Sequence, residues 1–189
     1  KVDSLENELA KADERSKSKI YNELADATRR EFAKSKAYAD EALRLATKHN
    51  DQKQRVIALK TMGLATGYDN RYDEALKYLL ESLSLAEKHR EWTLAGDDAI
   101  NIGTVYYVVL SNYEKALDYY LRSLTFYEQA GDQKGIAPAL SGLGITYTHE
   151  KKFKIAQEHL FRSLAIYQEL KEVREVPKLH VNIGSCYQD

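Results

Sequence analysis

The chain has 189 residues, of which 43% are hydrophobic and 30% are charged, a composition typical of a folded, well-solvated protein and not of a disordered one. Its 28 basic and 29 acidic residues nearly cancel, which gives no electrostatic reason to expect nucleic acid or an anionic membrane as a partner. The single cysteine, Cys186, excludes an internal disulfide framework, and a lone thiol suits a reducing compartment, which favours a cytoplasmic location.

Glycine recurs along the chain at an almost constant interval. With only two prolines and nine glycines in the sequence, the chain is expected to be mostly helical. Four of those glycines are separated by 40, 41 and 40 residues, and similar residues surround each of them: Gly63, Gly103, Gly144 and Gly184. A period in this range is typical of stacked repeats, in which each repeat is one small unit of secondary structure.

The units can be followed in chain order. Residues 16–55 fit the pattern loosely, with Asn22-Glu23-Leu24-Ala25 where the glycine motif would fall. Three clear units follow, each with two segments that carry apolar residues at helical spacing, and they span residues 56–95, 96–136 and 137–176. Residues 177–189 begin a fifth unit that stops before its second helix, so we expect a truncated unit there.

The breaks between units carry turn chemistry. Asn50 and Gly131 suit a left-handed residue that ends a helix. The residues that follow them, Asp51 and Asp132, suit the N-cap of the next helix. These signals place a helix boundary on both sides of each break.

Two further features bear on helix boundaries. Residues 96–136 form a unit one residue longer than its neighbours, and we expect the extra residue in the turn at Ser111-Asn112. Pro138 and Pro177 lie six and seven residues before a repeat glycine, and proline is tolerated in the first turn of a helix but not in its interior. We therefore expect two helices to start or kink near these prolines, with residues 134–137 and 174–176 loosely wound.

Small residues form two rows. Each repeat glycine precedes an alanine of the second helix by 12 or 13 residues, so these small residues are expected to face each other and let the two backbones approach: Gly63 with Ala75, Gly103 with Ala116, and Gly144 with Ala156. The second row is expected where one hairpin stacks on the next, and it consists of Ala42, Ser82, Ser123 and Ser163.

The spacing of Gly103, Tyr106, Ala116 and Ser123 resembles that of tetratricopeptide repeats, and the units around Gly63 and Gly144 match equally well. The resemblance implies an all-α fold, a right-handed superhelical solenoid of antiparallel helix-turn-helix hairpins, as a single array over residues 1–189. Units of 40 to 41 residues that lack a closing proline resemble the longer variant found in N-terminal arrays of bacterial signalling proteins.

The resemblance also implies that the first helix of each unit lines a concave groove. Positions counted from the repeat glycine nominate seven groove residues: Thr61, Asp97, Asn101, Tyr107, Thr148, Lys178 and Asn182. Asn22 and Gln188 occupy equivalent positions in the first and last units. An asparagine amide offers both a donor and an acceptor, so a row of them could pair with the backbone of an extended peptide; alternatively, these amides cap local backbone or face water.

The sequence contains no readable set of catalytic or metal-binding residues. Its five histidines lack metal-ligand spacing, and His149 is expected at a helix end or on the surface. We therefore expect no enzyme activity, cofactor or metal, and interpret the chain as a protein or peptide interaction scaffold, the sensory or regulatory segment of a larger bacterial signalling protein. The alternative is an oligomerisation module that pairs downstream effector domains by stacking end to end through Ile183, Cys186 and Tyr187.

Overall fold

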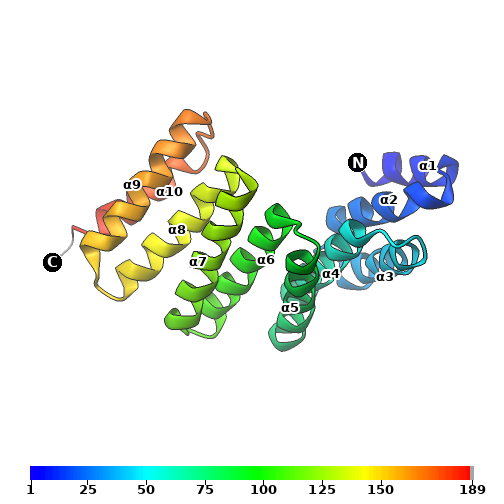
Figure 1. Ribbon diagram of the computed structural model, residues 1–189, viewed down its shortest axis with the longest axis horizontal. Helices are drawn as coiled ribbons and strands as arrows, with labels where there is room; N and C mark the ends of the chain where they lie inside the picture. The colour runs from blue at the N-terminus through cyan, green and yellow to red at the C-terminus, as the bar shows by residue number, and fades with distance from the viewer. Residues whose placement is uncertain (188–189) are drawn as a thin grey trace. The chain divides into compact units, whose positions relative to one another are not determined.

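The computed structural model describes residues 1–187, and over this range the chain consists of helices without any strand (Figure 1). The predicted all-α fold is confirmed. Contacts divide the chain into two compact units, residues 1–94 (unit 1) and 95–189 (unit 2). The elements are α1 Val2–Lys11, α2 Glu14–Ala27, α3 Phe32–Lys48, α4 Gln52–Tyr68, α5 Tyr72–Lys88, α6 Trp92–Thr104, the π-helical turn η1 Val105–Val109, α7 Tyr113–Ala130, α8 Gln133–His149, α9 Phe153–Glu169 and α10 Val176–Ser185.

Unit 1 is built from two helix hairpins, α2 with α3 and α4 with α5. Helix α1 packs on α2, and α3 packs on α4, so the helices form a continuous series of neighbours. The apolar stripe of each helix is buried in this packing, and the largest side chains that are almost fully buried are Leu24, Leu45, Val56 and Leu79.

Unit 2 repeats this arrangement. Helix α6 with η1 forms a hairpin with α7, α8 forms one with α9, and α10 packs on both α8 and α9. Its fully buried side chains include Ile102, Leu140, Leu143 and Leu160. The hairpins thus present α6 with η1, α8 and α10 as successive first helices, and we call the surface that these three elements share the first-helix face of unit 2.

The turns agree with the signals in the sequence. A residue with positive φ ends the second helix of each hairpin, at Asn50, Arg90, Gly131 and Lys171. The side chains of Asp51 and Asp132 accept hydrogen bonds from the backbone of the helix that follows, as predicted for N-caps. Within the hairpins, left-handed residues recur at equivalent places: Asn70, Ser111 and Lys151.

The extra residue of the unit 96–136 lies in a helix and not in the turn. Tyr106 and Tyr147 are equivalent, because each follows its repeat glycine by three residues and stacks on a ring of the next helix. Four residues (107–110) separate Tyr106 from the left-handed Ser111, whereas three (148–150) separate Tyr147 from the left-handed Lys151. The additional residue therefore lies between positions 107 and 110.

The helix absorbs this residue as the π turn η1. The amide of Asn112 bonds to the carbonyl of Tyr106, six residues back, whereas the equivalent amide of Lys152 bonds to Tyr147, five residues back. The expectation that the Ser111-Asn112 turn holds the extra residue is wrong. A left-handed residue and the Asn112 N-cap fix the length of that turn, so the insertion is displaced into the preceding helix.

The glycine row faces the second helix of its own hairpin, as predicted. A Cβ atom placed on Gly144 would lie 2.5 Å from Leu160 Cγ and 3.1 Å from the carbonyl oxygen of Ala156, and Gly63 has equivalent contacts with α5. Gly103 instead lies against the ring of Tyr120, 2.9 Å from its Cε1 by the same measure. These positions exclude larger side chains because the two helices are in contact there.

The serine row needs a correction. Each serine hydroxyl donates to a backbone carbonyl in the first helix of its own hairpin, at 2.7–2.9 Å: Ser82 to Val56, Ser123 to Gly96 and Ser163 to Ala137. The row therefore lies inside the hairpins and not where one hairpin stacks on the next. The reason is helical phase, since each serine follows its row alanine by seven residues, or two turns, and shares its face.

The two prolines behave differently. Helix α10 starts at Val176, with Pro177 in its first turn after a non-helical stretch, as expected. Helix α8 starts at Gln133, so Pro138 lies inside it and residues 134–137 are regular helix, which the sequence analysis did not predict. The Asp132 N-cap fixes the start of α8, and burial of Ile136 and Ala137 stabilises its first turns.

Candidate functional site

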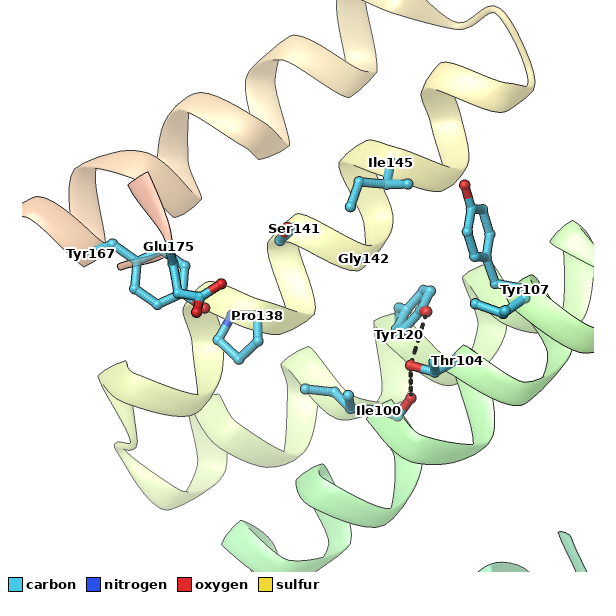
Figure 2. Close-up of a pocket in the computed structure, with 11 residues that line it drawn as sticks. Ile100, Thr104, Tyr107, Tyr120, Pro138, Ser141, Gly142, Ile145, Tyr167 and Glu175 are labelled. Carbon is cyan, nitrogen blue, oxygen red and sulfur yellow. Dashed lines mark hydrogen bonds between the residues drawn. The ribbon is translucent and has the colours of Figure 1, made fainter. Parts of the chain in front are cut away.

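The first-helix face of unit 2 contains two adjoining hollows. The larger, of about 300 Å³, is lined by Ile100, Thr104, Tyr107, Val108, Tyr120, Pro138, Ser141, Gly142, Ile145, Tyr167 and Glu175 (Figure 2). The smaller, of about 200 Å³, is lined by Tyr107, Ile145, Thr148, His149, Asn182 and Ser185. Tyr107 and Ile145 line both, so one extended ligand could occupy the two hollows together.

The larger hollow combines an apolar wall with tyrosine rings. Tyr120 forms part of its floor, and its hydroxyl lies 3.3 Å from that of Thr104, which in turn donates to the carbonyl of Ile100. Burial raises the pKa of Tyr120, and the charge of Glu175 adds to burial in raising the pKa of Tyr167 to about 12. Both phenols therefore keep their protons beyond the pH at which an ordinary tyrosine, with a pKa of about 10, loses its own.

The smaller hollow is more polar and is bounded by an aromatic cluster. The rings of Tyr107 and His149 meet edge to face, with centroids 5.3 Å apart, and His149 also stacks on Tyr113 at 5.2 Å. The Thr148 hydroxyl donates to the carbonyl of Gly144 and lies 3.2 Å from Cys186 Sγ. The lining thus combines this aromatic cluster with hydroxyl and amide groups from α8 and α10.

The π turn helps to create this arrangement. Four residues, 107–110, lie between Tyr106 and the left-handed turn residue, whereas the equivalent part of α8 has only three. One of the four, Val108, is well exposed and lines the larger hollow. Tyr107, at the centre of η1, contacts the aromatic cluster and faces both hollows. π turns inside α-helices occur frequently at functional sites, which directs attention to η1.

Three of the seven nominated groove residues come together. Tyr107, Thr148 and Asn182, from η1, α8 and α10, line the smaller hollow. Asn101 belongs to α6 in the same unit but lines neither hollow. Lys178 lies beside the larger one, where its ammonium group pairs with Glu175 at 3.0 Å.

The remaining nominated residues have structural contacts. Asp97 accepts a hydrogen bond from the hydroxyl of Tyr127 at 2.7 Å, which ties α6 to α7. Thr61, in unit 1, is buried and donates to the carbonyl of Ile57, so it offers almost no surface to a ligand. Gln188 lies outside the described residues.

Asn22 lines a separate hollow of about 330 Å³ in unit 1. Its side chain is almost fully buried, and its amide nitrogen donates to the backbone carbonyl and to Oε1 of Gln54 at 3.0 and 2.9 Å. These bonds join α2 to the first turn of α4. The amide nitrogen of Asn22 is therefore used in a contact between two helices, which is neither a cap on local backbone nor an exposed group.

Sequence reasoning missed several of the residues that form the hollows. Tyr120 was not nominated, His149 was expected only at a helix end or on the surface, and Glu175 was placed in a loosely wound stretch. The one signal that could have directed attention here is the 41-residue unit, because an insertion in a repeat that is otherwise constant marks a local departure from regular helix.

Within residues 1–187, no group of three or more histidine, cysteine or acidic side chains is arranged to hold a metal ion. Over the same residues, none of the helices combines the length and the apolar character that crossing a membrane requires.

Comparison with known families supports the repeat assignment. Residues 98–169 match the family model for the tetratricopeptide repeat. This part of the chain is therefore similar to tetratricopeptide repeats. A search of curated protein sequences finds no significant match, and no catalytic family is indicated by the match to the repeat model.

Solved structures share the fold. BtubC from P. vanneervenii is 21% identical, with a TM-score of 0.82 over 98% of this chain and 78% of its own. A signal transduction ATPase with numerous domains and a tetratricopeptide repeat sensor, from Pyrococcus horikoshii, is 22% identical, with a TM-score of 0.79 over 97% of this chain. A Rap protein complexed with competence and sporulation factor is 20% identical, with a TM-score of 0.84 over 98% of this chain.

The share of the neighbour's own length that matches this chain differs between these structures. The chain spans 29% of the signal transduction ATPase and 57% of the Rap protein. At identities near 20%, the likeness establishes the hairpin-repeat fold and no more.

Proposed function

We propose that the chain is a protein-interaction scaffold that binds an extended peptide or a segment of a partner protein on the first-helix face of unit 2. The observation that carries this proposal is the pair of adjoining hollows that share Tyr107 and Ile145. A peptide lying across α6 with η1, α8 and α10 would place successive side chains in the two hollows.

The chemistry of the lining suits such a ligand. Tyrosine rings supply large contact areas at low cost in conformational entropy, and they are enriched at sites where proteins bind one another. The Asn182 amide and the Ser185 hydroxyl add hydrogen-bonding groups at the smaller hollow. A few fixed polar groups beside an apolar surface are typical of ligand sites.

The structural neighbours support the wider context. One carries a tetratricopeptide repeat sensor in a signal transduction ATPase, and another is a Rap protein in complex with competence and sporulation factor. By analogy, we infer that this chain is the sensory or regulatory segment of a larger bacterial signalling protein.

Selection from a random peptide library displayed on phage tests the binding site. Peptides recovered with the wild-type chain should lose most of their affinity for Tyr107→Ala combined with Asn182→Ala, measured by fluorescence anisotropy. Asn101→Ala is the matched control, since Asn101 is a partly buried first-helix asparagine outside both hollows and its replacement should leave affinity unchanged. Full affinity of every selected peptide for the double variant would contradict the site.

A second candidate function is self-association through α10. Ile183 and Cys186, which the sequence analysis assigned to this contact, are buried against α9 and are not available for it. Val181 and Tyr187, however, are 69% and 65% exposed, and Gly184 on the same helix has open space around it. Sedimentation over a range of concentrations checks this, and a concentration-dependent dimer should be weakened by Val181→Glu.

A further inference from the structure

The larger hollow carries one charge on an otherwise uncharged lining. Among its eleven lining residues only Glu175 is ionisable near neutral pH, and it lies at one end, beside Tyr167 and Pro138 (Figure 2). The rest of the lining consists of apolar side chains, three tyrosines, one glycine and the hydroxyl-bearing side chains of Thr104 and Ser141. A hollow of this kind favours a ligand side chain whose end carries a positive charge over one whose end is neutral or negative.

The carboxylate of Glu175 can exchange its ion-pair partner. It pairs with Lys178 three residues later, at 3.0 Å, but the side chain of Lys178 is 73% exposed and that of Glu175 is 42% exposed. An ion pair at this exposure contributes little, because water and salt screen it and both side chains lose conformational freedom. A cation brought in by a ligand could therefore displace Lys178 at small cost.

The surroundings favour a cation that reaches Glu175 from inside the hollow. The ring of Tyr167 lies next to the carboxylate, and a cation over a tyrosine face is attracted by its π electrons. Ile100, Pro138 and Ile145 provide the apolar wall along which methylene groups would pack. The long side chains of lysine and arginine combine such an apolar stem with a charged head.

We propose that the larger hollow binds the side chain of a lysine or arginine in the peptide ligand, with its stem on the wall formed by Ile100, Pro138 and Ile145 and its charged head on Glu175 in place of Lys178. This inference rests on the proposed peptide-binding function and adds the chemical class of the anchor residue. An acidic side chain at the same position is repelled, and a neutral apolar one leaves Glu175 paired with Lys178.

The same peptide selection tests this inference. Peptides recovered with the wild-type chain should carry lysine or arginine at one fixed position. Replacing that residue with norleucine, which keeps the stem and removes the charge, should weaken binding roughly fivefold to tenfold. Glu175→Gln should weaken the basic peptide by a similar factor, and the norleucine peptide should bind Glu175→Gln and wild type equally.

Lys178→Ala is the matched control, because it removes the competing cation and leaves the carboxylate in place. It should bind the basic peptide at least as tightly as wild type does. Selected peptides that depend on Tyr107 but have no basic position would overturn this inference and leave the proposed function intact. The absence of any peptide that depends on Tyr107 or Asn182 would overturn both.

Discussion

Two hairpins of unit 2 follow the same pattern and differ by one residue. Helices α8 and α9 form the regular 40-residue version, whereas α6, η1 and α7 form a 41-residue version. Both have a tyrosine three residues after the repeat glycine and a left-handed residue in the turn. The turn has the same length in both, and only the end of the first helix differs, because the turn is fixed by its left-handed residue and the helix can widen into a π turn.

The comparison shows how an insertion changes the surface of a hairpin without changing its fold. In α8 the regular helix end contributes Thr148 and His149 to the smaller hollow. In the longer hairpin the same interval contributes Tyr107 to both hollows and Val108 to the larger one. This interval thus lines both hollows in the longer hairpin and one in the regular hairpin, while the internal contacts are repeated almost unchanged, such as the serine-to-carbonyl bonds of Ser123 and Ser163.

The largest expected effect concerns the close approach of the helices at the glycine row. Gly144→Ala places a Cβ 2.5 Å from Leu160 Cγ, and Gly103→Ala places one 2.9 Å from the ring of Tyr120. Overpacking of this kind costs about 1–3 kcal/mol. We expect Gly144→Ala near the upper end of that range, and Gly103→Ala below it, by urea denaturation.

Gly184→Ala is the control for the glycine row. Its Cβ would meet nothing within 4 Å, and alanine is favoured over glycine in a helix by about 1 kcal/mol. This variant should therefore be as stable as wild type or more so. Equal destabilisation of all three variants would show that helix contact does not explain the glycine row.

Deleting Val108 converts the longer hairpin to the regular spacing. Three residues would then separate Tyr106 from Ser111, as in α8, and η1 should become regular α-helix. We expect the fold to persist and peptide binding to weaken about tenfold, or about 1.4 kcal/mol, by anisotropy with the selected peptides. Unchanged binding with a cooperative melt would mean that the π turn does not shape the site.

The serine bonds should have smaller and similar effects in the two hairpins. Ser163→Ala removes a buried bond to the carbonyl of Ala137, and Ser123→Ala removes the bond to Gly96. Each should cost about 1 kcal/mol, measured by urea denaturation. Ser185→Ala, whose bond is local and exposed, should have almost no effect. A clear difference between Ser123→Ala and Ser163→Ala would show that the π turn alters packing deeper in the hairpin.

Periodicity in the sequence predicted the hairpins well, because residues that make the same packing contact in each hairpin recur at the same interval. The glycine spacing located the helix contacts, and Asp51 and Asp132 located helix starts. The serine row was predicted in the wrong place. Each serine follows its alanine by seven residues, or two turns, so the two lie on the same face of the helix, and that face points into the hairpin. The position of the insertion could not be predicted, because a 41-residue spacing fits an extra turn residue and a π turn equally.

Prediction of the candidate site was limited for a related reason. Counting from the glycines nominated Tyr107, Thr148 and Asn182, which line one hollow in the structure, because these residues follow the helical phase. The same count also nominated Thr61, but this residue is buried and its hydroxyl donates to the carbonyl of Ile57 in the same helix. Glu175 and Tyr167 come from a helix start and a second helix, so no count within first helices could nominate them.

The smallest expected effect compares one tyrosine from each hairpin in alkaline solution. Burial raises the pKa of Tyr120, and burial together with the charges of Glu175 and Glu172 raises that of Tyr167 to about 12, against an ordinary value of about 10. A tyrosine in the unfolded chain then loses its proton first as the pH rises. Any stability that depends on these phenols is complete below about pH 10 and declines between about pH 10 and 12.

Phenolate absorbance should show Tyr167 titrating late, and Tyr167→Phe should remove that late phase while leaving the one due to Tyr120. A titration in which Tyr167→Phe removes a phase near pH 10 would mean that Tyr167 is open to water and that the end of the larger hollow beside Glu175 is not enclosed.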